Sequence, residues 1–296
     1  MRCYAVGRMK WTVNADFAGD LVEIMRGQLK GMDLDVPAHM KPDDVSFRFW
    51  TALRRRIRPS PRTIRVARGF VCPADVQVGL GRVRGKFERG EDLTLHLSRR
   101  IEKVMSEDPL LYDWDIHHFH LGEVTAQNPR GRSGNILFAR VTLDTAYFIS
   151  VLPHDNWSNL KLFQIVQENW PESLRPLVGI KPGEAVTDDD VATARRKGFQ
   201  YLPQSPNGVV YMPPGGGYTA SGLSADVLST SDRVFDRLQH LQRAAEGDAV
   251  SIARQLQEQG YEPENPMRLC LAVKDNVLYA QERRSAATFR LGGLFE

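Results

Sequence analysis

Residues 136–152, ILFARVTLDTAYFISVL, decide the fold class of this chain. The two halves, residues 136–143 and 145–152, are rich in β-branched and aromatic side chains, which favour strands. Only Asp144 separates the halves, so the segment predicts an antiparallel β-hairpin. A third run at residues 116–121 predicts another strand, and the three together predict a small antiparallel sheet.

Amphipathic helices are expected on both sides of this hairpin, because apolar residues recur there at helical spacing. The expected helices cover residues 15–30, 45–57, 93–105, 157–170, 189–197, 232–246 and 248–259. Further β signals lie at residues 63–71 and 208–212, and in a final hairpin of residues 268–274 and 277–282 around Asp275 and Asn276. The pattern predicts an α+β fold, a small antiparallel sheet with flanking helices plus a C-terminal α/β segment.

A change in amino-acid composition after Pro171 predicts a domain boundary near residue 180. Residues 1–180 then form a helical and basic N-terminal part with the central sheet and the histidines, and residues 181–296 form the C-terminal segment. No apolar run approaches the roughly 18 residues that span a bilayer, and no secretory signal is evident at the start. We therefore expect no membrane partner and a cytoplasmic location.

Three of the seven histidines lie in the stretch WDIHHFHLG, residues 114–122. On a strand, His118 and His120 share one face, whereas His117 lies on the other. His154 follows the hairpin, where we expect a helix to start. Strand ends commonly supply the residues of functional sites, so the histidines predict a site.

One chemistry open to this site is acid–base catalysis without a metal. His118 or His120 would act as the general base and His154 as the general acid. Arg140 and Tyr147, on the two hairpin strands, would hold a phosphate group. RNA cleavage through the 2′ hydroxyl needs such an acid, a base and a cationic group, and no cofactor is then expected.

Two other interpretations of the histidines remain open. In one, His118 and His120 bind a divalent transition metal together with His154 or a carboxylate such as Asp115 or Glu123. In the other, the imidazoles only form hydrogen bonds inside a half-buried sheet.

Arginine is concentrated between residues 48 and 68, which hold eight arginines and no acidic residue. Guanidinium groups bind phosphate through two parallel hydrogen bonds and stack on bases, so this run predicts a nucleic-acid partner, with RNA favoured. The opposing interpretation is a solvated helix face with internal ion pairs, since the net charge is only +3. The expected phosphate contacts are Arg54, Arg55, Arg56, Arg58, Arg62 and Arg65.

The order of helices, small antiparallel sheet and gathered His, Arg and Tyr over about residues 90–170 resembles RelE-like and barnase-like endoribonuclease toxins. The resemblance implies a metal-independent endoribonuclease of toxin or defence type, with a protein antitoxin or regulator as a possible partner. The stretch of residues 113–122 also resembles strings in bacterial proteins. The alternatives are a non-catalytic nucleic-acid- or protein-binding module of a bacterial mobile element, and a metal-dependent hydrolase that uses the histidine cluster.

Overall fold

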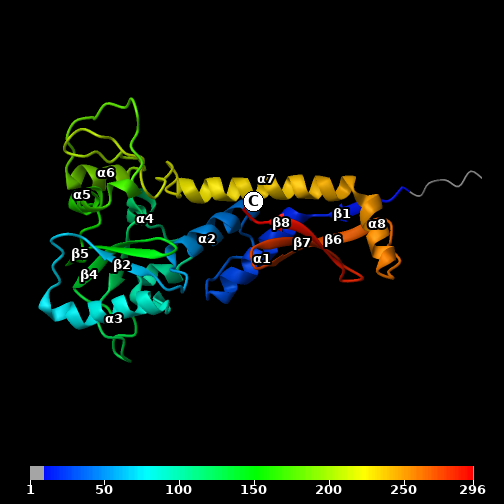
Figure 1. Cartoon of the computed structure of the whole chain (residues 1–296), viewed down its shortest axis with the longest axis horizontal. Helices are drawn as coiled ribbons and strands as arrows, with labels where there is room; N and C mark the ends of the chain where they lie inside the picture. The colour runs from blue at the N-terminus through cyan, green and yellow to red at the C-terminus, as the bar shows by residue number, and fades with distance from the viewer. Residues whose placement is uncertain (1–9, 296) are drawn as a thin grey trace, which may run out of the picture. The chain divides into compact units, whose positions relative to one another are not determined.

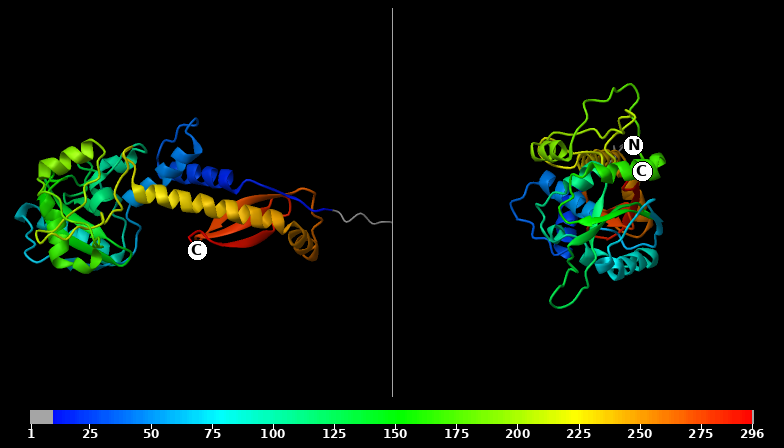
Figure 2. Two further views of the ribbon diagram at one scale, coloured as in Figure 1. Left: turned by 90° about the horizontal axis from the view of Figure 1, so that it is seen from above. Right: turned by 90° about the vertical axis from the view of Figure 1, so that its left-hand side faces the viewer.

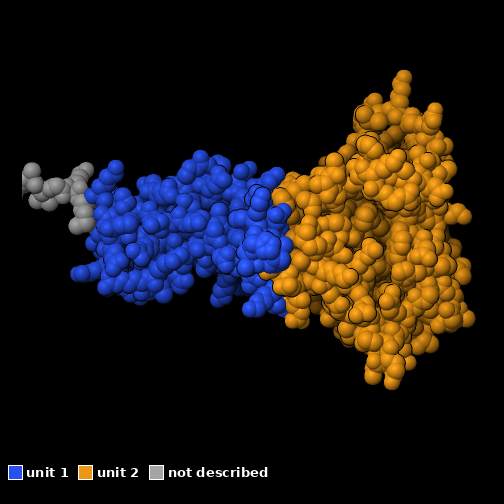
Figure 3. All heavy atoms as spheres, turned by 180° about the vertical axis from the view of Figure 1, so that it is seen from behind, with its two compact units in different colours: residues 1–31, 37–46, 230–296 blue, residues 32–36, 47–229 orange. Residues whose placement is uncertain are grey.

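The computed structural model describes residues 10–295 of the chain, which divides into two compact units (Figure 3). Unit 1 comprises residues 1–31, 37–46 and 230–296, and unit 2 comprises residues 32–36 and 47–229. Helices α2 (Pro42–Arg55) and α7 (Ala225–Gly247) contribute residues to both units. Each unit holds one four-stranded sheet together with helices, so the fold is α+β. The boundary expected near residue 180 falls inside unit 2.

The hairpin predicted from residues 136–152 is the centre of the sheet in unit 2. Strands β4 (Asn135–Val141) and β5 (Thr145–Pro153) pair antiparallel, and β3 (His117–His120) pairs antiparallel with β4. These two pairings of three strands confirm the predicted antiparallel sheet. Strand β2 (Thr63–Val66) adds to β5 in parallel, so the complete sheet is mixed, in the order β2-β5-β4-β3.

Helices cover both faces of this sheet (Figures 1 and 2). On one face, Phe87 of α3 (Gln77–Arg89) meets Phe119 and Phe148 edge-on, with ring centroids 5.3 and 5.8 Å apart. On the other face, α5 (Leu160–Asn169) buries Phe163 in the same cluster as Phe138. A sheet that buries both faces explains why the hairpin strands are almost continuously apolar.

Several helix predictions in unit 2 need correction. Residues 93–105 form two short 3₁₀ helices, η2 (Thr94–His96) and η3 (Arg99–Glu102), because the backbone is extended at Leu97 and Ser98 caps a new turn. Helix α5 begins at Leu160, after the cap residue Asn159, and not at residue 157. Helix α6 (Asp188–Arg196) is capped by Thr187 through a capping box. Helix α3 was not predicted.

The segment from residue 171 to 224 is mostly irregular. Residues 208–212 form only isolated bridges, such as the one between Gln204 and Val210, and not the expected strand. The glycine-rich residues 213–217 pack against helix α4 (Pro109–Trp114), where Gly217 N donates to the carbonyl oxygen of Tyr112 at 2.8 Å. This loop is therefore integrated into the fold of unit 2.

Unit 1 contains the predicted C-terminal hairpin. Strands β6 (Met267–Lys274) and β7 (Val277–Glu282) pair antiparallel, and Asp275 and Asn276 have the positive φ values of 51° and 60° that a type I′ turn requires. Strand β8 (Thr288–Gly293) continues the sheet beside β7, and β1 (Val13–Ala15) joins β6 in parallel. Helix α1 (Phe17–Gly31) packs against β6, and α1 and α8 (Ala249–Glu258) lie close to the predicted helices. Helix α7 begins at Ala225, seven residues before the predicted start. No described helix is both long enough and apolar enough to cross a membrane.

Candidate functional site

Strand β3 lies at the edge of the sheet in unit 2 and fixes the directions of its three histidines. His118 pairs with Phe138 and His120 with Ile136, and the ring centroids of His118 and His120 are 6.4 Å apart. The ring of His117 lies 6.2 Å from that of Phe119, on the opposite face. The shared face predicted for His118 and His120 is confirmed.

His154 comes to the same place from the end of β5. Its imidazole stacks on that of His120, with ring centroids 5.4 Å apart and planes 18° apart. The residue lies in a turn, and not at the start of a helix as expected, because α5 begins six residues later. Its Nδ1 lies 3.9 Å from a carboxylate oxygen of Asp155.

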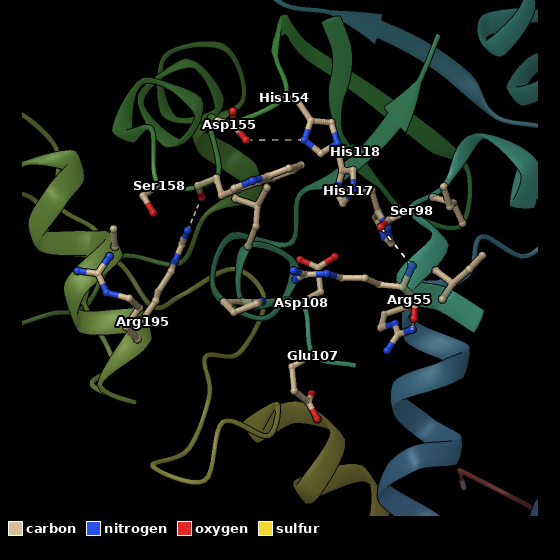
Figure 4. A pocket seen from close by; sticks show the side chains of 18 residues that line it. Arg55, Ser98, Glu107, Asp108, His117, His118, His154, Asp155, Ser158 and Arg195 are labelled. Carbon is tan, nitrogen blue, oxygen red and sulfur yellow. Dashed lines mark hydrogen bonds and ion pairs between the residues drawn. The ribbon is translucent and has the colours of Figure 1, made fainter. Parts of the chain in front are cut away.

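His118 and His154 line one cavity of about 550 Å³. The Trp157 indole also lines it and contacts both imidazoles, with its ring centroid 4.6 Å from that of His118 and 4.9 Å from that of His154. Figure 4 shows these histidines with His117 at one end of the cavity and Glu107 at the other. Arginines from three segments complete the wall: Arg55, Arg100, Arg195 and Arg196.

Two acidic residues of the cavity, Glu107 and Asp108, are fixed by local structure. Asp108 caps helix α4, and its Oδ1 accepts a hydrogen bond from Leu111 N at 3.2 Å. Glu107 accepts hydrogen bonds from Arg48 and, at 2.7 Å, from the hydroxyl of Tyr112. Both carboxylates are therefore held by the fold.

Burial controls the protonation of the imidazoles on β3. It lowers the pKa of His118, and the charges of His154 and Arg100 lower it further, although Asp108 opposes them. Burial also lowers the pKa of His117 and of His120 to about 4. These three side chains are neutral near pH 7, and a neutral imidazole can accept a proton. The Nδ1 atom of His118 is buried without a hydrogen-bond partner among the described residues.

Arg140 and Tyr147 pair with each other across β4 and β5, but neither lines the cavity. The Arg140 guanidinium donates to Ser173 Oγ at 2.9 Å and pairs with Asp115 at 3.4 Å. The Tyr147 ring packs against Trp170, with centroids 4.9 Å apart. The structure thus brings together His118, His120 and His154, and places Arg140 and Tyr147 elsewhere on the same sheet.

Most of the arginines predicted to contact phosphate bind main-chain oxygens of unit 2 instead. Arg55 donates to the carbonyl oxygens of Arg100, Lys103 and Ser106. Arg54, Arg56 and Arg62 donate to the carbonyl oxygens of Gly215, Ile101 and Thr142, respectively, at 2.6, 3.0 and 2.7 Å. Arg65 is exposed and pairs with Glu172 at 3.4 Å, and Arg58 is also exposed.

No group of three or more His, Cys, Asp or Glu side chains within residues 10–295 is placed to hold a metal ion. Of the carboxylates considered as metal ligands, Asp115 pairs with Arg140, and Glu123 is exposed after β3.

The sequence prediction missed most residues of the cavity wall, among them Arg100, Asp108, Trp157 and Arg196. Asp108 had a usable signal, because Asp followed by Pro is typical of a helix cap and first turn. Arg100 and Arg196 had none, since nothing local distinguishes them from other surface arginines.

No protein-family model, no curated protein and no solved structure was found to match the chain. A functional assignment therefore depends on the chemistry of the cavity itself.

Proposed function

We propose that the chain is an endoribonuclease that cleaves RNA in the histidine cavity by acid–base catalysis without a metal. The observation that carries this proposal is that His118 and His154, from different segments of the chain, both line one cavity and both contact Trp157. Two imidazoles from different segments can serve the two proton transfers of the reaction, and the indole that contacts both offers a surface on which a base can stack.

His118 suits the role of general base. Its lowered pKa keeps it neutral at pH 7, so that it can remove the proton of a 2′ hydroxyl. The 2′ oxygen then attacks the adjacent phosphorus and forms a 2′,3′-cyclic phosphate as the bond to the 5′ oxygen breaks.

His154 suits the role of general acid. Its side chain is 39% exposed, and its Nδ1 lies 3.9 Å from a carboxylate oxygen of Asp155. It would give its proton to the departing 5′ oxygen, and bulk water can then reprotonate it. His120, which stacks on His154, would hold that ring in place.

The phosphate would be bound by Arg100 and Arg196, which line the cavity and are both exposed. Two other arginines of the wall already bind groups of the protein. Arg195 pairs with the buried Asp113 at 2.8 Å, and Arg55 holds carbonyl oxygens. A cavity of this volume matches a small ligand, so one or two nucleotides at the scissile bond would occupy it.

The test is cleavage of a fluorophore–quencher RNA oligonucleotide in EDTA by the wild type and by His154→Ala and His118→Asn. Loss of a general acid or base costs about 10²–10⁴-fold in rate, and we expect losses in that range for both variants. His240→Ala, an exposed histidine of α7 in unit 1, is the control and keeps the wild-type rate. Melting curves verify that each variant is folded.

The chemistry has two further signatures. A 2′-deoxy substitution at the scissile nucleotide abolishes cleavage, and the product ends in a 2′,3′-cyclic phosphate. A wild-type protein that cleaves no RNA would overturn the proposal in favour of a non-catalytic binding module. Activity that EDTA abolishes and Mn²⁺ restores would overturn it in favour of a metal-dependent hydrolase.

A toxin or defence role follows from the same proposal. Expression of the wild type in a bacterium should arrest growth by degrading cytoplasmic RNA, and expression of His154→Ala should not. Equal growth of both cultures would contradict a toxic role, and a protein antitoxin would then not be needed.

A further inference from the structure

The sheet of unit 1 buries one face and leaves the other accessible. Met267, Leu269 and Leu271 of β6 are buried, and so are Leu278 and Ala280 of β7. The alternate side chains of β6, β7 and β8 lie on the opposite face, which we call the open face. None of them is buried: Arg268, Cys270, Ala272, Lys274, Val277, Tyr279, Gln281, Thr288 and Arg290.

An aromatic side chain occupies the middle of the open face. Tyr279 lies on β7, between β6 and β8, and its cross-strand neighbours are Ala272 and Arg290. Ala272 is small, and Tyr279 is only partly buried although it lies on an inner strand. A base can therefore reach the ring from the solvent side.

The charges on the open face are of one sign. Arg268, Lys274 and Arg290 are exposed and have no ion-pair partner within the part of the chain that the structure describes. The acidic residue of these strands, Glu282, points to the other face, is buried, and accepts a hydrogen bond from Ser285 N at 2.7 Å. A surface of this kind attracts a polyanion.

We propose that the open face of the unit 1 sheet binds single-stranded nucleic acid, with Tyr279 stacking on a base and Arg268, Lys274 and Arg290 contacting phosphates. Aromatic rings on a sheet surrounded by cationic side chains bind unpaired bases in this manner, because every base has an apolar face and every linkage a negative charge. An acidic peptide would satisfy the charges but would make no use of the ring. This site does not depend on RNA cleavage in unit 2.

The experiment measures fluorescence anisotropy of a labelled, 2′-O-methylated 12-nucleotide RNA with the full-length protein. Methylation blocks attack by the 2′ oxygen, so binding is measured whether or not the protein is a nuclease. The open-face variant carries Arg268→Gln, Lys274→Gln and Arg290→Gln. The matched control carries the same change of charge on exposed helix positions of unit 1: Lys30→Gln, Arg243→Gln and Arg254→Gln.

Binding should weaken with salt, and the open-face variant should lose part of that dependence. Single strands release about 0.7 counterion per phosphate contact, so the loss of three contacts should reduce the slope of log K against log salt by about 2. The control variant should keep the wild-type slope. Tyr279→Ala should weaken binding about 10-fold, whereas Tyr279→Phe, which keeps the ring, should bind as the wild type does.

Three results would overturn the proposal. One is the absence of binding by the wild type at low salt. Another is an equal change of slope in the open-face and control variants, which would indicate a general effect of charge. The third is a duplex of the same sequence bound as tightly as the single strand, with Tyr279→Ala without effect.

Discussion

Gly79 of helix α3 should be intolerant of the smallest possible substitution, and its response tests how the histidine strand is supported. A Cβ atom at this position would lie 1.6 Å from the carbonyl oxygen of Leu121 and 2.6 Å from its carbonyl carbon. Leu121 directly follows His120, at the end of β3. Both clashing atoms belong to the main chain, so no side-chain rotation can relieve the contact. In Gly79→Ala, α3 or the end of β3 must move by more than 1 Å.

The cost of this movement can be set against the gain in helix propensity. Overpacking of a tight interior typically costs about 1–3 kcal/mol, and a clash this severe belongs at the upper end of that range. Alanine in place of glycine stabilises a helix by about 1 kcal/mol. The net loss in the free energy of unfolding is therefore about 2 kcal/mol. For a unit of this size, that loss lowers Tm by about 4–8 °C.

Gly81 provides a control within the same helix. A Cβ atom there meets nothing within 4 Å, and the residue is exposed. Gly81→Ala makes the same chemical change without a clash, so it should raise Tm by about 2–4 °C. Thermal unfolding followed by circular dichroism compares the two variants directly. A Gly79→Ala protein that melts at or above the temperature of Gly81→Ala would refute the close contact between α3 and the end of β3.

The remaining predictions concern buried charge in unit 2. Asp113→Asn should lower the free energy of unfolding, measured in urea, by about 3–5 kcal/mol, because it leaves the guanidinium of Arg195 buried without its ionic partner. The control is Glu88→Gln, which removes an exposed carboxylate and should lower the free energy of unfolding by less than about 0.5 kcal/mol. The unfolded imidazole titrates near pH 6.5, whereas burial lowers the pKa of His117 and His120 to about 4 in the folded protein. Below pH 6.5 the unfolded chain therefore binds more protons, so stability should be complete above pH 6.5 and fall towards pH 4, by about 2 kcal/mol for each of these histidines at pH 5. Unfolding midpoints at pH 7 and pH 5 measure the loss, and a pH-independent midpoint would contradict the burial of these two rings.

The elements that the sequence predicted correctly are those whose signal is local. Two runs of β-branched and aromatic residues separated by Asp144 gave the pairing of β4 with β5. Strand alternation gave the shared face of His118 and His120, because a period of two assigns each side chain to a face. The pair Asp275 and Asn276 indicated a turn that the structure confirms. Each of these predictions needed only a few adjacent residues.

The elements that escaped prediction depend on distant residues or on packing. The parallel pairing of β1 with β6 joins Val13 to Met267, and no local sequence pattern predicts a partner strand so far along the chain. Helix α3 was missed because three glycines weaken its helical signal. One of them, Gly79, is explained only by the strand end that lies against it. The cavity also depends on residues far apart in the sequence, since its wall combines η3, α4, β3 and the turn after β5.

The arginines of residues 48–68 were predicted to bind nucleic acid, but several of them stabilise the fold instead. The segment around η3 consists of short 3₁₀ turns, in which Lys103 N donates to the carbonyl oxygen of Arg100 and Ser106 N to that of Lys103. Arg55 and Arg56 add side-chain donors to the carbonyl oxygens of this segment: Arg55 donates to those of Arg100, Lys103 and Ser106, and Arg56 to that of Ile101. Burial lowers the pKa of both arginines, which is the electrostatic cost of this arrangement. The same contacts hold the segment that carries Arg100 into the cavity wall. Two arginines that the sequence pattern assigned to phosphate thus support, through the main chain, Arg100, the arginine to which the proposed function assigns the phosphate.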